Sequence, residues 1–399
     1  MIKTDILVVG GGIVGLSIMR EMVKRHPGLT FTLLEKEDAL GRHASGRNSG
    51  VLHAGFYYSP ESLKARFTVE GNRLMTEYCL ERGIAINRCG KVVVAKNEGD
   101  LKTLDELERR GRANGVNLKI VDEKELSDIE PNAKTFGRAI YSPTTSSVNP
   151  QDVVDAVGGE LTAKNNVKIL FGERFIARSG DNAVTTNRQK IEYGRLINTA
   201  GLYADKVAHA FGAGLRYTLV PFKGLYMEYK DPGLLKKHVY PVPDIKNPFL
   251  GVHFTVTADG KVKAGPTATP ALWRENYSGL AGFDAGEMGD ILLRQARMFL
   301  QNSFGFREIA VQEVKKYMRG NFTAQAATLV KKIDVAKFGQ YIRPGIRAQL
   351  FDTANMKLVM DFIVEHAGRS THVLNAVSPA FTCAFTFASH VADEIEKQG

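Results

Sequence analysis

The chain of 399 residues lacks any long uncharged apolar run. A helix needs roughly 18 such residues to cross a bilayer, so the sequence does not predict a membrane-spanning protein. It has only three cysteines, Cys79, Cys89 and Cys383, whose spacing fits neither a disulfide framework nor a metal-binding motif. The first apolar run, 6–9, leads straight into glycines and leaves no room for a cleavable signal sequence. We therefore expect a cytoplasmic protein with reduced cysteines and no bound metal.

Repeats, low-complexity tracts and obvious linkers are also missing from the sequence. The composition, 44% hydrophobic and 24% charged, is that of a globular protein with a sizeable core. Lysine and arginine (53) outnumber aspartate and glutamate (43), which gives a net charge of +10. Such an excess makes nucleic acid, an anionic membrane surface and an anionic substrate candidate partners. Basic stretches interleaved with aromatic residues are absent, which argues against nucleic acid and leaves peripheral contact with the inner membrane open.

The N-terminal segment has the pattern of a nucleotide-binding unit. It reads as strand, helix and strand, over residues 5–9, about 13–26 and 30–34. Gly10, Gly12 and Gly15 form a Gly-x-Gly-x-x-Gly motif between the first strand and the helix. These glycines permit a tight turn, close approach of the backbone to a pyrophosphate and close packing of the helix on the strand. Glu35 ends the second strand, where an acceptor for ribose hydroxyls belongs.

The rest of the chain changes character along its length. We expect a helix over 101–115, strands over 166–171 and 191–198, strands over 219–268 with a turn at 258–260, helices over 284–336, strands over 358–364 and 372–374, and a helix over 381–395. Residues 195–205 form a strand that ends in small residues before a helix, a segment able to approach a nucleotide closely. The pattern favours one nucleotide-binding domain interrupted by a substrate domain.

Two stretches are specific enough to indicate a family: 43–58 and 345–349. Further motifs occur at 62–65, 70–73, 89–91, 221–224, 240–243, 249–253 and 375–380. In these segments the chain closely resembles the FAD-dependent L-2-hydroxyglutarate dehydrogenase/oxidase family, within the D-amino-acid-oxidase-like flavoproteins that include glycine and sarcosine oxidases. The matches run the length of the chain.

The resemblance implies an α/β fold. A Rossmann-like FAD-binding domain, built from 1–85, 145–215 and 340–399, would interleave with an α+β substrate-binding domain, 86–144 and 216–339, that contains a large antiparallel sheet. FAD would bind non-covalently in extended form. The implied contacts are Gly10, Gly12 and Gly15 at the pyrophosphate; Glu35 at the adenosine ribose; Ser45, Gly46, Asn48 and Ser49 at the flavin-side phosphate and ring; the backbone of Phe175 at the adenine; Thr199, Ala200, Gly201 and Tyr203 in a second nucleotide loop; and Ser378, Pro379 and Ala380 at the pyrimidine edge, where the last helix would start. Ile13, Val14, Lys36 and Gly50 are further cofactor contacts that the resemblance implies.

One segment departs from the family pattern. Where the family usually has a glycine-containing turn followed by Leu-Val-Asp-Asp-Phe, this chain reads Asn-Met-Lys-Leu-Val-Met-Asp-Phe over 355–362. Met356 and Met360 thus replace a glycine and an aspartate. The fold remains compatible with these changes, and substrate preference is the property they bring into question.

Oxidation of a 2-hydroxy acid requires a clamp for the carboxylate, a base for the hydroxyl proton and a fixed position for the α-hydrogen against flavin N5. Arg347 is the preferred clamp, because a guanidinium makes two parallel hydrogen bonds to a carboxylate and stays charged. The base is His53 or His253, since an imidazole titrates near neutral pH. Strand alternation over 251–264 puts His253 on a polar face, whereas His53 lies in the segment expected to touch the flavin and could orient it instead.

A dicarboxylate substrate needs a second polar clamp. The candidates in matching motifs are Tyr57, Tyr58, Lys223, Tyr226 and Tyr240. Lys223 is alternatively a cation that activates oxygen beside the flavin, as lysines do in related oxidases.

These features predict an FAD-dependent oxidoreductase that converts L-2-hydroxyglutarate to 2-oxoglutarate by hydride transfer from the α-carbon to flavin N5. The electron acceptor would be a quinone, another carrier or oxygen. Two alternatives remain: an amino-acid or amine oxidase or dehydrogenase of the same fold, and a non-catalytic flavin- or NAD-binding module.

Overall fold

A computed structural model describes residues 1–244 and 249–398. The chain divides into two compact units, each assembled from separate segments. Unit 1 comprises Met1–Asn48, Pro150–Pro221 and Arg347–Gly399, and unit 2 comprises Ser49–Asn149 and Phe222–Ile346. Residues 49–85, 145–149 and 340–346, expected in the FAD-binding domain, cluster with unit 2, and residues 216–221, expected in the substrate-binding domain, cluster with unit 1.

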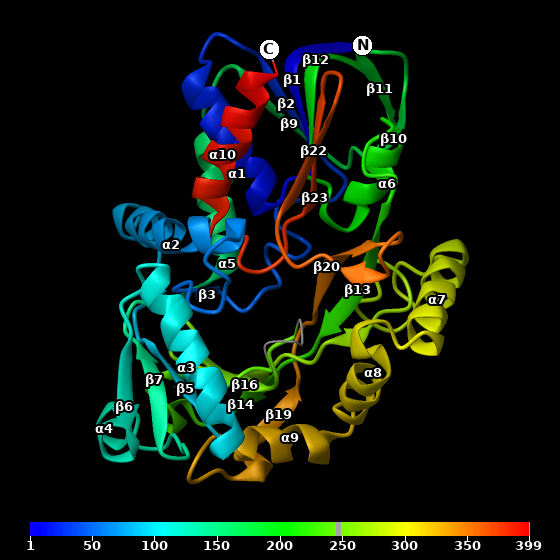
Figure 1. Cartoon of the computed structure of the whole chain (residues 1–399). Coiled ribbons are helices and arrows are strands. Elements are labelled where there is room, and N and C mark those ends of the chain that lie inside the picture. The colour runs from blue at the N-terminus through cyan, green and yellow to red at the C-terminus, as the bar shows by residue number, and fades with distance from the viewer. Residues whose placement is uncertain (245–248, 399) are drawn as a thin grey trace. The chain divides into compact units, whose positions relative to one another are not determined.

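Unit 1 is built on a sheet that is largely parallel (Figure 1). Its parallel strands lie in the order β9 (Val167–Phe171), β2 (Phe31–Glu35), β1 (Ile2–Val9), β12 (Lys190–Asn198) and β23 (Ser370–Asn375). Antiparallel strands extend the sheet from β12 and β23: β11 (Ala183–Thr186), β10 (Phe175–Arg178) and β22 (Ile363–Ala367). The second half of β1, Ile6 to Val9, is apolar and buried, and every residue of β2 is buried, as expected for a parallel sheet covered on both faces.

Three helices lie side by side on one face of this sheet in Figure 1: α1 (Ile13–Arg25), α5 (Pro150–Thr162) and α10 (Ala384–Lys397). In α1 the apolar residues Leu16, Met19 and Val23 recur at helical spacing and are buried, while Lys24 and Arg25 occupy the last turn, where they favour the negative end of the helix dipole. On the opposite face, α6 (Ala204–His209) follows the short helix η1 (Gly201–Tyr203) and covers an apolar cluster on β1 and β12. These layers fix the carboxyl ends of β1, β2 and β12 next to one another.

Unit 2 contains a mixed sheet, described over residues 91–341 outside the gap, in the order β19 (Phe338–Tyr341), β14 (Met227–Tyr229), β17 (Val262–Gly265), β16 (His253–Val256), β15 (His238–Pro241), β5 (Lys91–Val94), β7 (Arg138–Ser142) and β6 (Lys119–Asp122). Neighbouring strands pair antiparallel except for β15 and β5, which run parallel. The large antiparallel sheet is thus present, with one parallel pair. One of its faces packs on an apolar cluster that includes Val92, Val239 and Phe254.

The remaining elements of unit 2 are helices and short strands. The helices are α2 (Leu63–Glu81), α3 (Glu98–Ala113), α4 (Glu123–Ile129), α7 (Ala285–Leu300), α8 (Phe306–Lys315) and α9 (Arg319–Ala327), with short helices η2 (Pro232–Leu234), η3 (Ser303–Gly305) and η4 (Val335–Lys337). A small sheet joins β3 (Val51–Leu52), β8 (Ser146–Val148) and β4 (Ile86–Asn87). Another has the order β18 (Thr269–Pro270), β13 (Tyr217–Gly224), β20 (Gly345–Asp352) and β21 (Lys357–Leu358), and its strands β13 and β20 carry the chain between the units.

Two expected boundaries were wrong. The helical region predicted to reach residue 336 ends as regular α-helix at Ala327, because the chain then turns and an isolated bridge pairs Val330 with Ala133. The last helix begins at Ala384 and not at Ser378–Ala380. There the cis bond before Pro379 and a turn at Val377–Ala380 precede the helix, and Cys383 is its N-cap.

Candidate functional site

The glycine motif sits where β1 ends and α1 begins, and the structure leaves no space for side chains there. Gly10 has φ 109°, a conformation that side chains rarely adopt. A Cβ atom on Gly10 would lie 2.5 Å from the Thr199 carbonyl oxygen. One on Gly15 would lie 2.3 Å from the Gly10 carbonyl oxygen and 2.5 Å from Thr199 Oγ1. The glycine turn, the first part of α1 and the loop at Thr199 are therefore packed closely against one another.

The N-terminus of α1 carries no acidic residue in its first turn, and its N-cap Gly12 offers no side chain. The Ile13 N–H, one residue before Val14, donates instead to Ser45 Oγ at 2.9 Å. A Cβ on Gly12 would lie 3.0 Å from the same hydroxyl oxygen. The predicted pair of segments, 10–15 and Ser45, thus meets at one helix end, whose positive dipole favours an anionic group.

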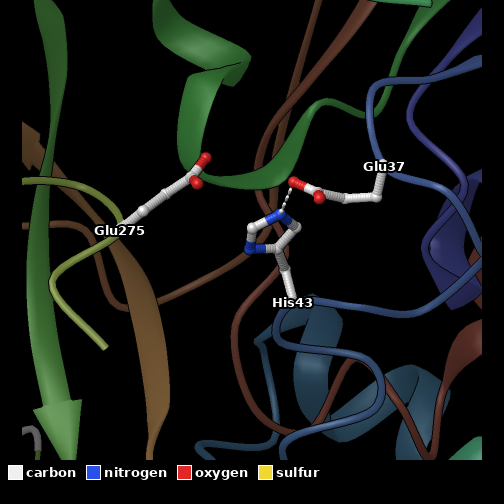
Figure 2. Close-up of side chains that lie close together, drawn as sticks. All are labelled: Glu37, His43 and Glu275. Atoms are coloured by element: carbon white, nitrogen blue, oxygen red, sulfur yellow. Dashed lines mark hydrogen bonds and ion pairs between the residues drawn. The ribbon is translucent and has the colours of Figure 1, made fainter. Parts of the chain in front are cut away.

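Glu35 is buried at the end of β2 and binds backbone on both sides. Its Oε2 accepts from the Gly11 N–H and its Oε1 from the Glu37 N–H, both at 2.9 Å. Glu37 pairs with Lys36, and Glu37 Oε1 lies 2.9 Å from His43 Nε2 (Figure 2). Burial raises the pKa of Glu37, but its bonds to Lys36 and His43 prevail and leave that pKa below its usual value. The carboxylate of Glu35 therefore ties the glycine turn to β2.

The second predicted nucleotide loop follows β12 directly. Thr199 Oγ1 donates to the carbonyl oxygens of Val9 at 3.0 Å and Gly10 at 3.2 Å, so this loop is bonded to the glycine turn. Ala200 and Gly201 lead into η1, and the Tyr203 ring lies under the Lys36 ammonium at 5.8 Å. Sequence reasoning missed Asn198, whose Oδ1 accepts from the Ala200 N–H and whose Nδ2 lies 3.1 Å from His372 Nδ1.

Other residues expected near FAD have mainly backbone partners or dense packing. Asn48 Nδ2 donates to the Ser45 carbonyl oxygen at 2.8 Å, and Gly46 has the Gly41 carbonyl oxygen 2.4 Å from where a Cβ would be. Ser49 and Gly50 belong to unit 2, and Gly50 has φ 77°. Phe175 begins β10 and its ring lies 6.1 Å from that of Phe211 in the sheet core. Ser378, Pro379 and Ala380 form the cis-proline turn before α10.

In unit 2, His253 lies on β16 with a defined tautomer. Its Nδ1 is 2.9 Å from the Gly251 carbonyl oxygen, and because a carbonyl oxygen only accepts, Nδ1 carries the hydrogen. The uncharged ring then has its lone pair on Nε2, as a proton acceptor requires. The ring stacks on Tyr240 with centroids 3.7 Å apart. Burial lowers the pKa of His253 to about 3, an effect that nearby lysines increase.

His238, which sequence reasoning did not single out, has the opposite tautomer. The Val256 N–H donates to His238 Nδ1 at 3.0 Å, so the hydrogen resides on Nε2, which lies 3.4 Å from Cys89 Sγ. Burial lowers the pKa of His238 to about 3 and raises that of Cys89 to about 11. With both ring nitrogens engaged by the protein, His238 is a structural imidazole.

Three other predicted site residues of unit 2, His53, Tyr57 and Tyr58, follow strand β3 in the chain. His53 is buried beside β3, where Asn72 Nδ2 donates to its carbonyl oxygen at 3.2 Å. The carbonyl oxygens of Tyr57 and Tyr58 accept from Arg110 at 3.1 Å and Asn114 at 3.0 Å.

Lys223 Nζ donates to Asn276 Oδ1 at 2.9 Å, and burial lowers the pKa of this lysine. The Tyr226 ring faces the Lys263 ammonium at 5.1 Å. Arg347 is half-buried on the part of β20 that belongs to unit 1.

Comparison with known proteins gives the family. A family model described as FAD dependent oxidoreductase matches residues 5–394. The chain belongs to that family. Residues Gly10 to Gly15 fit the cofactor that the FAD-dependent oxidoreductases bind, because the glycine turn admits no Cβ and ends at a helix N-terminus whose N-cap residue has no side chain. FAD is therefore its cofactor and oxidation–reduction its chemistry.

Curated relatives within this family of FAD-dependent oxidoreductases match nearly the whole chain. A protein of Nematostella vectensis named "L-2-hydroxyglutarate dehydrogenase, mitochondrial" is 38% identical over 422 residues, 98% of this chain and 90% of the relative. The Homo sapiens protein of that name is 35% identical over 421 residues, 99% and 89% of the two chains. The L-2-hydroxyglutarate dehydrogenase of Salmonella houtenae is 32% identical over 409 residues, 98% and 93%.

Solved structures share the fold of the family. The L-alpha-glycerophosphate oxidase of Mycoplasma pneumoniae with FAD bound superimposes with a TM-score of 0.79 at 22% identity, over 99% of this chain and 95% of that one. Glycine oxidase of Geobacillus kaustophilus gives 0.73 at 19% identity, over 100% and 96%. Among the residues that the structure describes, no helix is both long and apolar enough to cross a membrane.

Proposed function

We propose that this FAD-dependent oxidoreductase oxidises the hydroxyl group of L-2-hydroxyglutarate and forms 2-oxoglutarate. The observation that carries the proposal is the identity of 32–38% with proteins named for this reaction, along 98–99% of the chain. The glycerophosphate oxidase and the glycine oxidase described above are 22% and 19% identical to this chain and support the fold alone.

His253 is the proposed base. Bound FAD supplies the two-electron acceptor for the hydride of the α-carbon. Oxidation also releases the hydroxyl proton, which the lone pair on His253 Nε2 can take because Nδ1 is held as a donor to Gly251. His238 is a poor candidate, since its Nδ1 already accepts the Val256 N–H. His53 keeps its alternative role of orienting the cofactor.

Arg347 is the proposed ligand of the substrate's α-carboxylate. A guanidinium holds a carboxylate by two parallel hydrogen bonds and fixes its orientation as well as its charge. For the second carboxylate we propose the hydroxyl and amine groups of Tyr57, Tyr58, Lys223, Tyr226 and Tyr240.

The test is anaerobic bleaching of the flavin absorbance with a panel of acids on the purified yellow protein. L-2-hydroxyglutarate should reduce the flavin, whereas its D-enantiomer, glycine, sarcosine and L-glycerol 3-phosphate should not. Reduction by glycine or sarcosine without reduction by L-2-hydroxyglutarate would establish the amine-oxidising alternative. A colourless protein that takes up no added FAD would establish the non-catalytic one.

We further propose that the electron acceptor is a membrane-borne carrier such as a quinone, reached by peripheral contact of α7 and α8 with the bilayer surface. Large apolar side chains on these helices are exposed, including Leu293 at 55% and Leu300 at 73%. Arg297 and Arg307 are exposed on the same helices. Apolar and cationic groups together are what an interfacial helix presents to anionic lipid.

Cosedimentation with vesicles containing anionic lipid tests this contact. The double variant L293E/L300E should bind vesicles less than the unaltered protein and keep its reduction by substrate. Leu215, 68% exposed in unit 1, supplies the matched control, because L215E should bind as before. Equal binding of all three proteins would exclude α7 from the contact, and efficient reduction of oxygen in place of quinone would exclude the carrier.

A further inference from the structure

Lys91 is a buried cation that the proposed reaction does not yet use. It starts β5 in unit 2 and has 0% of its surface exposed. Its Nζ lies 4.7 Å from the ring centroid of Phe56, 4.6 Å from that of Tyr57 and 4.7 Å from that of Tyr240. Within the described part of the chain Nζ has no hydrogen-bond partner. The lysine is therefore enclosed in a box of three aromatic rings.

Such a lysine is a poor choice for stability alone. Burial disfavours the ammonium and lowers the pKa of Lys91 to about 7. The electron-rich faces of the three rings act in the other direction and favour the charged form. Leucine or methionine would fill the same space without the cost of desolvation, because an apolar side chain has no charge to desolvate. A site that keeps lysine under these conditions points to a use for its charge.

The strand register shows which groups share the face of Lys91. Lys91 is opposite His238 on β15, and Thr255 on β16 is opposite Lys263 on β17. Because Val239 pairs with Phe254, the next pair of residues across β15 and β16 is Tyr240 with His253. Side chains at alternate positions share a face, so these polar groups lie opposite the apolar cluster around Phe254.

Tyr240 is the physical link between Lys91 and His253. One face of its ring meets the Lys91 ammonium at 4.7 Å, and the ring stacks on the His253 imidazole at 3.7 Å. Tyr240 is 1% exposed and His253 is 4% exposed, so water screens the interaction weakly.

We propose that Lys91 is a positioning residue of the oxidation, whose boxed ammonium holds Tyr240 against His253 and, together with burial, keeps the His253 imidazole unprotonated and ready to accept the hydroxyl proton. The role rests on the proposed function of His253. It concerns the free enzyme, however, and so can be tested without any substrate.

Other charged and titratable groups act on His253 from the packed elements. They are His238 and Tyr240 on β15, Lys263 on β17, and Lys316 after α8 with its partner Glu313. Lys316 is paired with a carboxylate, and Lys263 is partly exposed and faces Tyr226. Lys91 is the cation that combines full burial with the absence of a carboxylate partner in the described residues, so its charge should have the largest effect.

The experiment compares Lys91→Met with Lys96→Met, a control at an exposed lysine just beyond the same strand. The FAD-loaded proteins are labelled at histidine, and the His253 pKa is followed by NMR without substrate, with His253→Asn used to assign the signal. Lys91→Met should melt at the same or a higher temperature, and its His253 pKa should rise by at least half a unit. The acid limb of the flavin reduction rate should move to higher pH by a similar amount. Lys96→Met should change none of these.

An unchanged His253 pKa in a folded Lys91→Met protein would overturn the proposal, whatever happens to activity. If Lys91→Met does not fold, Phe56→Leu removes one ring and keeps the lysine, and the His253 pKa should again rise, by less. No movement in that variant would equally overturn it. Failure of the function itself has a different signature, namely a shifted His253 pKa in an enzyme that L-2-hydroxyglutarate does not reduce.

Discussion

Gly15→Ala and Gly28→Ala, two single substitutions in the first βαβ unit, should have opposite effects on the free energy of unfolding. Gly15 lies in α1, where a Cβ would be 2.3 Å from the Gly10 carbonyl oxygen, more than 1 Å inside ordinary contact. Because that atom is backbone, α1 has to move away from the glycine turn. Overpacking of this kind costs about 1–3 kcal/mol, and the better helix propensity of alanine returns about 1 kcal/mol. We expect Gly15→Ala to lose up to about 2 kcal/mol of unfolding free energy.

Gly28 is the matched control. It is exposed in the turn between α1 and β2, and a Cβ there would meet nothing within 4 Å. Gly28→Ala should be neutral or gain about 0.4–1 kcal/mol, because alanine restricts the unfolded chain.

The assays are thermal unfolding of the FAD-free proteins and titration with FAD. Gly15→Ala should lower Tm by up to about 8 °C. It should also weaken FAD binding at least tenfold, which corresponds to about 1.4 kcal/mol, since the helix N-terminus moves relative to the turn. A Gly15→Ala protein with the Tm and FAD affinity of Gly28→Ala would refute the assignment of this turn as the pyrophosphate site.

The remaining predictions concern catalysis, backbone strain and pH. His253→Asn should slow anaerobic flavin reduction by about 10²–10⁴-fold, and an unaltered rate and pH profile would remove it as the base. Arg347→Lys should raise KM strongly with a smaller change in kcat, because bidentate geometry is lost; an unchanged KM would exclude it as the clamp. Met356 has φ 51°, so Met356→Gly should stabilise the protein by up to about 1 kcal/mol in a denaturant titration, and a lower midpoint would contradict this. Burial lowers the pKa of His238 and His253 to about 3 and of His372 to about 4, below the 6.5 of an unfolded chain. Stability should thus be full above pH 6.5 and fall as the pH is lowered through this window, by up to about 1.4 kcal/mol per pH unit for each group, and a Tm that is flat from pH 7 to 5 would disprove it.

The sequence predicted the elements whose pattern is local. The strand, glycine turn and helix over 5–26 were found because period-2 and period-3.6 hydrophobicity and the glycines all agree, and β1 and α1 confirm them. The hairpin at Gly260 was likewise expected, and β16 and β17 pair across it. Alternation also placed Phe254 and His253 on opposite faces, and Phe254 does lie in the apolar cluster. The start of α10 was misplaced because a turn at Val377–Ala380 precedes the helix, which hydrophobic spacing does not reveal.

Contacts between distant segments account for what sequence reasoning missed. Asn198 and His372 are 174 residues apart and meet only because β12 and β23 pair in register. Lys91 lies in a motif that was matched to a family, yet nothing local marks it as different from an exposed lysine. Its box needs Tyr57 and Tyr240, from a loop and from another strand, and the register of a folded sheet to bring them together.

His238 and His253, two buried histidines on the large sheet of unit 2, show how the structure narrows a choice that residue type cannot make. Both lie on the same sheet, and burial lowers both pKa values to about 3. Their partners differ in kind: a backbone N–H donor faces His238 Nδ1, and a backbone carbonyl acceptor faces His253 Nδ1. The first arrangement uses up the lone pair, and the second directs the hydrogen to Nδ1 and leaves Nε2 as the acceptor. A base must be uncharged and must have a lone pair to offer, so of these two imidazoles only His253 meets both conditions.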